Sequence, residues 1–202
     1  MNIRKTIFLF RRVHNKLSCY WNRIKFKLYG IKYGRNCIVH GHLGLKLNPD
    51  SIVSIGDDFY LSSGNHINPL ARNIEAHICV NKGAILTIGN KVGMSSPVIR
   101  VHKSIKIGNN VMFGANVIVM DSDAHSLNYL HRRNLSVDKQ HKVDIEVIIE
   151  DDVLIGMNTI IMKGTTIGAR SVIGAGSVVT KSIPSDCIAA GNPAKVIKTH
   201  KL

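Results

Sequence analysis

Two aspartates lead into a histidine in the segment Asp121-x-Asp123-x-His125. Both aspartates lie on the same face of the chain as the histidine if a strand continues through them. A histidine in this setting can act as a general base, and a neighbouring carboxylate can hold its imidazole in the useful tautomer. The plainer interpretation is a surface histidine beside two solvated turn carboxylates. These three residues alone leave both interpretations open.

The chain around this segment has a period of six residues, which neither a helix nor an ordinary strand explains. Aliphatic or aromatic residues recur in three frames, of which the first is the weakest: Ile55, Leu61 and Ile67; Ile107, Phe113 and Val119; and Ile149, Ile155, Ile161, Ile167, Ile173 and Val179. A small or β-branched residue comes two positions earlier, at Val153, Thr159, Thr165, Ser171 and Ser177. Each hexapeptide therefore sends a small and a larger side chain inward. Short strands at a fixed period predict a parallel β-helix, in which each coil packs on the next.

The repeat is interrupted once and then ends. Residues 124–147 are polar and follow no repeat, although Val119 and Ile149 are separated by a whole number of hexapeptides. These residues are predicted to form a loop extruded from the coil. The chain therefore divides into an N-terminal helix (1–30), a hexapeptide-repeat β-helix (31–183) and a C-terminal segment (184–202) that caps the last coil.

The N-terminal segment is predicted to form a basic amphipathic helix from residue 2 to about residue 29. Hydrophobic residues recur every three or four positions at Ile3, Ile7, Phe10, Val13, Leu17, Trp21, Ile24 and Leu28, and Gly30 is the expected stop. No Asp or Glu precedes Asp50. Such a helix either packs on the main domain or a neighbouring subunit, or lies on an anionic membrane surface. The sequence does not separate these interpretations.

Charge and composition narrow the class of partner. The formal net charge of +14 over 202 residues suits an anionic partner. No nucleic-acid-binding module is recognisable and aromatic residues make up only 5%, so no nucleic acid partner is expected. Four scattered cysteines without a C-x-x-C pair argue against a structural zinc site and indicate a reducing cytoplasm. No membrane-spanning helix and no signal peptide are expected.

Three features together carry a family resemblance: the hexapeptide repeats, the D-x-D-x-H segment that enters the extruded loop, and the ending IGAGSVVTKSIP…AAGNPAKVIK. Over residues 50–198 the chain resembles the hexapeptide-repeat acyltransferases. Within this family it looks most like the bacterial sugar and polysaccharide O-acetyltransferases, relatives of the maltose and galactoside acetyltransferases. The resemblance implies a left-handed β-helix, which is an exception to the right-handed crossover rule. It also implies a homotrimer that binds acetyl-CoA in clefts between subunits.

The resemblance also assigns roles to individual residues. His125 matches the family's catalytic histidine, and Asp121 or Asp123 is the candidate to orient it. The thioester oxyanion would meet a backbone N–H near Gly156 and Met157. The resemblance places the acetyl-CoA contacts at Gly156, Met157, Ala175, Thr180, Lys181, Lys195 and Lys198, with the lysines attracting the CoA phosphates. No metal is expected.

The acceptor side is less defined. Where the galactoside and maltose enzymes carry an Asn, this chain has Met94 and Ser95, so Ser95 is expected to face the acceptor. Basic residues of the loop either meet an acidic or phosphate-linked glycan or are simply solvated: His131, Arg132, Arg133 and His141. The predicted function is acetyl-CoA-dependent O-acetylation of a carbohydrate hydroxyl by direct transfer. Surface polysaccharide or lipopolysaccharide synthesis in the cytoplasm, near the inner face of the membrane, is the expected setting.

Two other enzyme classes stay open. A nucleotide-sugar N-acetyltransferase would use the same base to deprotonate an amine. A γ-type carbonic anhydrase would bind zinc between subunits, and histidines in or beside the repeats are available as ligands: His66, His77, His102 and His125. The VVTK…GNPAK ending argues against the anhydrase, which has no need of a CoA cleft. An inactive β-helix scaffold is disfavoured by the intact D-x-D-x-H segment.

Overall fold

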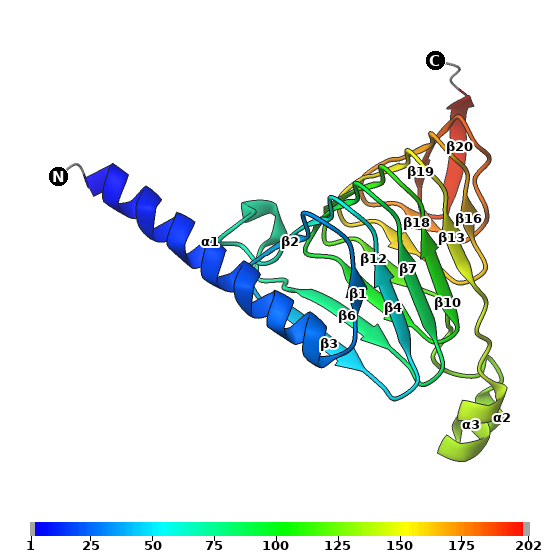
Figure 1. Ribbon diagram of the computed structural model, residues 1–202. Coiled ribbons are helices and arrows are strands. Elements are labelled where there is room, and N and C mark those ends of the chain that lie inside the picture. The colour runs from blue at the N-terminus through cyan, green and yellow to red at the C-terminus, as the bar shows by residue number, and fades with distance from the viewer. Residues whose placement is uncertain (1–2, 200–202) are drawn as a thin grey trace.

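The computed structural model describes residues 3–199, with all of their side chains except that of Thr6. The chain winds into a three-sided coil of short strands, and each coil adds one strand to each of three sheets (Figure 1). The neighbouring strands pair in parallel throughout the coil. This is the architecture of a parallel β-helix, with the core along its axis.

The strands of the three sheets follow one another along the axis in chain order. The first sheet contains β1 (Lys32–Tyr33), β4 (Ile52–Ile55), β7 (Ile85–Ile88), β10 (Ser104–Ile107), β13 (Val147–Ile149) and β16 (Thr166–Ile167). The second contains β2 (Ile38–His40), β5 (Tyr60–Ser62), β8 (Gly93–Ser95), β11 (Met112–Ala115), β14 (Leu154–Ile155), β17 (Val172–Ile173), β19 (Cys187–Gly191) and β20 (Ala194–Thr199). The third contains β3 (Leu43–Leu47), β6 (Ala76–Val80), β9 (Val98–Val101), β12 (Ile118–Met120), β15 (Ile160–Ile161) and β18 (Val178–Val179).

The hexapeptide pattern fixes the core. The aliphatic residues of the frame from Ile149 to Val179, and the small residues two positions before them, are at most 1% exposed. Equivalent residues lie three hexapeptides apart and pair directly across coils, as Ile149 does with Ile167 and Ile155 with Ile173. Each core side chain therefore packs against the equivalent side chain of the next coil. The predicted fold, a left-handed β-helix with an N-terminal helix, is confirmed.

One part of the predicted register is wrong. Ile55 and Leu61 are buried as expected, but Ile67 is only half-buried. It lies in a loop, residues 64–75, that leaves the coil after β5 and contains the 3-10 helix η1 (Pro69–Ala71). The chain turns outward at Gly64, which has a φ of +84°, a backbone conformation that glycine adopts without strain. We call this segment the 64–75 loop.

The predicted extruded loop leaves the coil between β12 and β13, and we call residues 121–146 the excursion. It contains two short helices, α2 (Tyr129–Arg132) and α3 (Leu135–His141). Asn128 and Asn134 cap their N-termini by accepting backbone N–H bonds. An antiparallel bridge between Ser122 and Asp144 closes its base.

The two ends of the chain are built differently. The helix α1 (Ile3–Leu28) packs its C-terminal half on the first coil and extends its N-terminal half away from the β-helix (Figure 1). At the other end, β19 pairs in parallel with β17, and β20 folds back antiparallel on β19 over the last coil. Among the helices in residues 3–199, none combines the length and the apolar run that crossing a membrane requires.

Candidate active site

The residues predicted to act together lie on two different edges of the three-sided coil. The Met157 edge, where the chain passes from the second sheet to the third, carries Gly156, Met157 and Ala175. The His125 edge, where the chain passes from the third sheet to the first, carries the excursion and, on a later coil, Thr180 and Lys181. A single chain therefore does not bring all the predicted residues together.

His125 pairs with a carboxylate that sequence analysis missed. Its Nδ1 lies 2.6 Å from Oδ2 of Asp138, a residue of α3 that is 3% exposed. The other carboxylate oxygen of Asp138 accepts the backbone N–H of Ser126 at 2.7 Å. Hydrogen bonds from His125 and from this N–H hold the pKa of Asp138 below its ordinary value, against the opposing effect of burial.

This geometry defines the state of the imidazole. Because an ionised Asp138 can only accept, Nδ1 of His125 carries a proton, and in the neutral imidazole the lone pair is therefore on Nε2. The His125 side chain is 66% exposed, and Nε2 forms no hydrogen bond with any described residue. In this pair the imidazole is exposed to solvent, and its orientation is set by a hydrogen bond to the buried carboxylate of Asp138.

The excursion positions both partners through local hydrogen bonds. The Asn134 cap starts α3, which places Asp138 one turn later, facing back towards His125. Arg132 Nη1 donates to the carbonyls of Ser126 and Leu127, at 2.6 and 2.8 Å, and so closes the segment that follows His125. Only the Asn caps and the loss of the repeat are visible in the sequence, because the pairing spans thirteen residues of irregular chain.

Asp121 and Asp123 do not orient His125 in this structure, which corrects the sequence-based expectation. The carboxylate of Asp121 is fully buried and accepts the backbone N–H groups of the turn below, including those of His102 and Ser104 at 2.7 Å. Asp123 forms an ion pair with Lys163 at 3.3 Å. The two aspartates therefore fix the base of the excursion to the adjacent coils, and the orienting position belongs to Asp138.

The Met157 edge offers backbone groups instead of side chains. The N–H of Gly156 donates to the Ile173 carbonyl at 2.7 Å, so it is committed to the coil and not available to an oxyanion. The N–H groups of Met157 and Ala175 donate to no described residue and lie on successive coils. A Cβ added at Gly156 would lie 2.4 Å from the Ala175 nitrogen, so only glycine allows this close stacking. Two neighbouring free N–H groups suit the carbonyl oxygens of an extended ligand.

The predicted phosphate-binding lysines are exposed. Lys195 and Lys198 lie on β20, and Lys181 follows β18 beside the exposed Thr180. None of these three lysines forms an ion pair with a described carboxylate. Their charge is therefore available to an anionic group at this end of the coil.

Ser95 is placed differently from the expectation that it faces an acceptor. It is 8% exposed, and its Oγ accepts a hydrogen bond from Asn68 Nδ2 at 2.7 Å. The Asn116 side chain, one coil further, donates to the carbonyl of Leu70 at 3.0 Å. Ser95 and Asn116 thus hold the 64–75 loop against the Met157 edge, and this loop had no signal in the sequence beyond its run of Asn and Pro.

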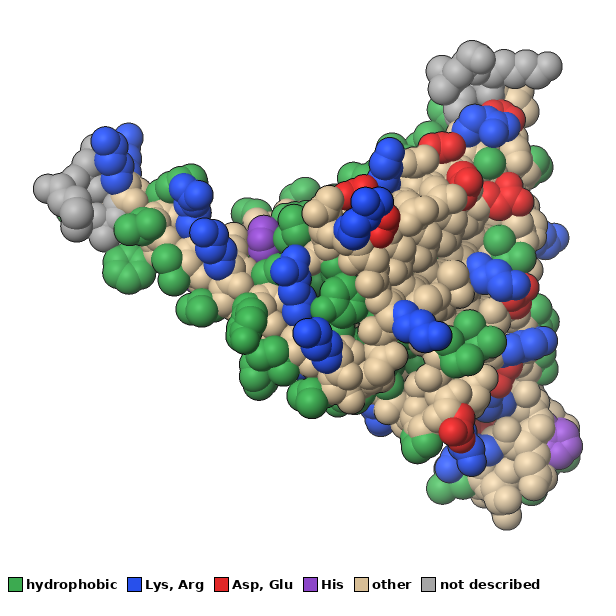
Figure 2. Space-filling view, in the orientation of Figure 1, with side chains coloured by type: hydrophobic (Ala, Val, Ile, Leu, Met, Phe, Trp, Pro, Cys, Tyr) green, Lys and Arg blue, Asp and Glu red, His purple; other side chains and the backbone are tan. Residues whose placement is uncertain are grey.

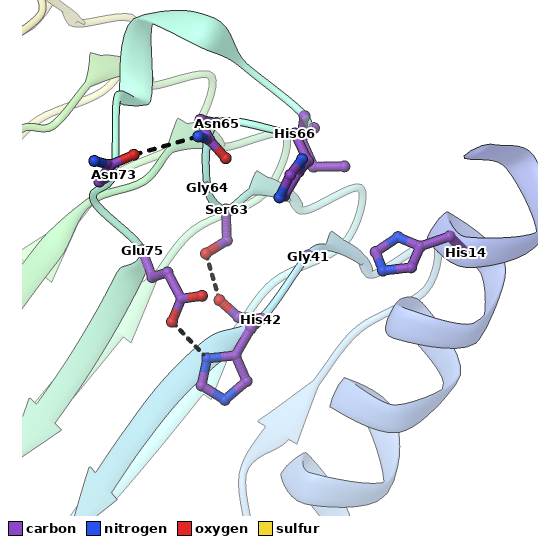
Figure 3. A pocket seen from close by; sticks show the side chains of 10 residues that line it. His14, Gly41, His42, Ser63, Gly64, Asn65, His66, Asn73 and Glu75 are labelled. Carbon is purple, nitrogen blue, oxygen red and sulfur yellow. Dashed lines mark hydrogen bonds and ion pairs between the residues drawn. The ribbon is translucent and has the colours of Figure 1, made fainter. Parts of the chain in front are cut away.

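A polar pocket of about 390 Å³ lies further along the Met157 edge, between α1 and the 64–75 loop (Figure 3). His42 Nδ1 lies 2.9 Å from Glu75 Oε2 at its base, and Asn65 and Asn73 are hydrogen-bonded above it. His14 of α1 and His66 of the loop complete its polar lining. The pocket presents hydrogen-bond donors and acceptors of the kind that hydroxyl-rich ligands use.

The four histidines considered as zinc ligands are dispersed. His66 lies in the 64–75 loop, His77 on β6, His102 on the turn below the excursion and His125 in the excursion itself. Within residues 3–199 of one chain, no three His, Cys, Asp or Glu side chains are grouped as metal ligands.

A second polar cluster holds the returning end of the excursion. Lys142 Nζ lies 3.2 Å from His102 Nδ1 and also pairs with Asp144. Burial, together with the charges of Lys142 and Arg100, lowers the pKa of His102, although Asp144 and Asp121 act in the opposite direction. His102 is therefore a neutral structural histidine, in contrast to the exposed His125.

Comparisons with known proteins agree with the fold and the repeat. The structure defines a hexapeptide-repeat β-helix. Residues 146–181 match the family described as bacterial transferase hexapeptide (six repeats), and residues 104–120 match the hexapeptide repeat of succinyl-transferase. These matches confirm the resemblance to the hexapeptide-repeat acetyltransferases that was seen in the sequence.

Individual relatives are sugar-modifying or acetyl-CoA-binding proteins by their names. A polysialic acid O-acetyltransferase of Escherichia coli O1:K1 / APEC is 39% identical over 129 residues, which cover 63% of this chain and 40% of that protein. The chain thus spans less than half the length of this relative. The structure of the polySia specific acetyltransferase NeuO has 29% identity and a TM-score of 0.55, with 84% of this chain and 81% of that chain covered. A hexapeptide-repeat acetyltransferase of Vibrio cholerae O1 biovar eltor, complexed with acetyl-CoA, has 28% identity and a TM-score of 0.53, covering 79% and 72%.

Proposed function

We propose that this protein transfers an acetyl group from acetyl-CoA to a hydroxyl group of a carbohydrate, with His125 as general base. The observation that carries the proposal is the His125–Asp138 pair, an exposed imidazole whose Nδ1 is bound 2.6 Å from a buried carboxylate. The similarity to hexapeptide-repeat acetyltransferases supplies the reaction class. The pair supplies the base that a neutral alcohol needs.

The proposed reaction is a direct transfer. Nε2 of His125 removes the proton of the acceptor hydroxyl as its oxygen attacks the thioester carbon of acetyl-CoA. The carbon–sulfur bond then breaks, and the proton on Nε2 passes to the leaving thiolate. Throughout, Asp138 accepts the Nδ1–H bond and stabilises the imidazolium. Positioned bases of this kind contribute roughly 10²–10⁴-fold to rate.

The Met157 edge would bind acetyl-CoA. The free N–H of Met157 is the proposed donor to the developing oxyanion, and that of Ala175 would pair with a pantetheine carbonyl. The exposed Lys181, Lys195 and Lys198 would attract the CoA phosphates. Glycine at position 156 keeps the two coils closely stacked, so that the N–H groups of Met157 and Ala175 lie on adjacent coils.

The division of these residues between two edges supports a homotrimer. The Met157 edge of one copy would face the His125 edge of the next, so that each cleft receives a base from one chain and backbone donors from another. Cyclic symmetry would close three such clefts.

The proposed acceptor is a glycan of the cell surface, acetylated in the cytoplasm, where acetyl-CoA is available. The polysialic acid O-acetyltransferase, by its name, acts on an acidic polysaccharide. The net charge of +14 and the basic residues of the excursion, including Arg132 and Arg133, are suited to an acidic acceptor of this class. The polar pocket between α1 and the 64–75 loop lies on the same edge and would hold further sugar units.

The test is CoA release from acetyl-CoA with a panel of neutral, acidic and amino sugars and oligosaccharides. Acceptor-dependent release should fall by roughly 10²–10⁴-fold in His125→Ala. The matched control, His77→Ala, removes an exposed histidine of β6, away from the excursion, and should retain activity. Release that survives in His125→Ala, or that occurs only with amino acceptors, would contradict the proposal as stated.

A further inference from the structure

The helix α1 is attached to the β-helix through a face that is not its most apolar one. Asn22 and Phe26 are buried on the first coil, where Asn22 Nδ2 donates to the Gly41 carbonyl at 2.9 Å and Phe26 meets the ring of Tyr33 edge-on. Ser18, one turn earlier, accepts the N–H of Gly41 at 3.1 Å. These residues are spaced by four, so they define the docked face.

The apolar residues that the sequence places on one side of α1 remain outside. We call the following exposed residues the apolar stripe: Ile3, Phe10, Val13, Leu17, Trp21 and Leu28. They are 47–79% exposed. At 3.6 residues per turn the stripe lies about a third of a turn from the docked face. The N-terminal half of the helix extends beyond the β-helix (Figure 1). Residues 3–199 leave the stripe exposed, although Phe10 also lines a hollow together with Pro69 of the 64–75 loop. Such a continuous exposed apolar surface indicates a binding partner.

The charges beside the stripe identify the partner. Lys5, Arg12, Lys16 and Lys27 recur at intervals that place them along one flank of the stripe. Figure 2 shows the row of Lys and Arg side chains running along the helix beside the hydrophobic ones. No Asp or Glu occurs before Asp50, so a copy of α1 placed against this flank would meet only like charge. An anionic lipid surface supplies both the negative charge and the apolar layer.

We propose that α1 is a membrane-surface helix that binds anionic phospholipid with its apolar stripe in the boundary between headgroups and acyl chains. Lys5, Arg12, Lys16 and Lys27 would reach the headgroups while their aliphatic stems lie along the lipid. Trp21 is suited to this boundary, because an indole has an apolar body and a polar N–H. The proposal stands independently of the acetyl transfer, since none of these residues belongs to the candidate active site.

The chain carries its own probe, because Trp21 is its single tryptophan. Full-length protein is titrated with phosphatidylcholine vesicles and with phosphatidylcholine–phosphatidylglycerol vesicles, and Trp21 emission and co-sedimentation are recorded. The expected result is a blue shift and sedimentation with the phosphatidylglycerol vesicles only. Each basic residue near an anionic surface contributes about fivefold to binding, so the loss of three should weaken it by about a hundredfold. The variant that tests this is Lys5→Gln/Arg12→Gln/Lys16→Gln. Phe10→Ser/Leu17→Ser should remove the blue shift.

The charge-matched control is Lys46→Gln/Lys82→Gln/Lys91→Gln, which removes three exposed lysines from the β-helix and should bind as the wild type does. Equal loss in this control would assign binding to the overall charge and overturn the proposal. Unchanged Trp21 emission with phosphatidylglycerol vesicles would also overturn it. So would a Trp21 already shielded from acrylamide without lipid, which would show that another copy of the chain covers the stripe.

Discussion

The Met157 edge and the His125 edge belong to the same coil but are built in opposite ways. On the Met157 edge, successive coils turn through left-handed residues in register, with φ of +62° at Asn116, +57° at Asn158 and +72° at Gly176. On the His125 edge, the chain leaves the coil for an excursion and returns at β13. The regular edge offers repeated backbone N–H groups, whereas the irregular edge offers a side-chain base. A repeat can therefore supply an extended binding surface, but placing a base on it requires an interruption.

The largest effect is expected at the irregular edge, from Asp138→Asn. The Asn amide would donate to Nδ1 of His125 and so force the proton onto Nε2, where it blocks the base. We expect kcat for acetyl transfer to fall by about 10²–10³-fold with little change in KM for acetyl-CoA. Steady-state kinetics check this, and a melting temperature equal to that of the wild type would show that the loss is not unfolding.

Asp121→Asn tests the other carboxylate of the His125 edge, which we expect to stabilise the fold and not to take part in acetyl transfer. Its carboxylate accepts three backbone N–H groups, from His102, Lys103 and Ser104, whereas an amide has one acceptor oxygen. The expected loss is about 1–3 kcal/mol in the free energy of unfolding, measured by urea denaturation. If folded Asp121→Asn had a kcat as low as that of Asp138→Asn, Asp121 would also be needed to orient His125, contrary to this account.

On the Met157 edge, we expect an added side chain at Gly156 to destabilise the fold. A Cβ at Gly156 would lie 2.4 Å from the Ala175 nitrogen, so Gly156→Ala must separate two coils, at about 1–3 kcal/mol of stability. Gly83→Ala is the control, because its Cβ meets no atom within 4 Å and costs only the strain of a φ of +70°. A Gly156→Ala variant that melts at the wild-type temperature would show that the coils are not in close contact here.

The smallest effect is expected from pH, through His102. Its pKa is lowered in the folded protein by burial and by Lys142, so as pH falls the unfolded chain takes up the proton first. Stability should therefore decrease as pH drops below about 6.5, the ordinary histidine value. Thermal melts between neutral and mildly acidic pH should show a weaker dependence in His102→Gln. An unchanged dependence would assign the effect to another group.

The sequence predicted the parts of the molecule that repeat. The inward aliphatic and small residues from Ile149 to Val179 all lie in the core, because each hexapeptide is repeated in the coil that it packs against. The prediction that Ile67 belongs to the repeat was wrong, because this residue lies in the 64–75 loop. Hydrogen bonds of Asn68 and Asn116 hold that loop, and the local sequence pattern does not reveal them. Periodicity also predicted α1 as a helix, but not that Asn22 and Phe26 would form its docked face.

The candidate site was predictable only in part. His125 was visible from its place at the end of the repeat. Asp138 was not, because its pairing depends on how α3 folds back inside the excursion. Asp121 and Asp123 were reasonable candidates by spacing, but burial and the N–H groups of the adjacent coil determine where the carboxylate of Asp121 points. The availability of the Met157 N–H, and the commitment of that of Gly156, are properties of coil stacking that side-chain identity does not reveal.

The most direct test of a site shared between the two edges uses two inactive variants, His125→Ala and Ala175→Trp, the second chosen to block the Met157 edge. Co-expressed in equal amounts, they should form mixed trimers in which one cleft of three has both edges intact. Acetyl transfer should then return to about a quarter of the wild-type rate, although each variant alone is inactive. Mixed trimers that form and remain inactive would show that each chain builds its site alone, contrary to the division proposed here.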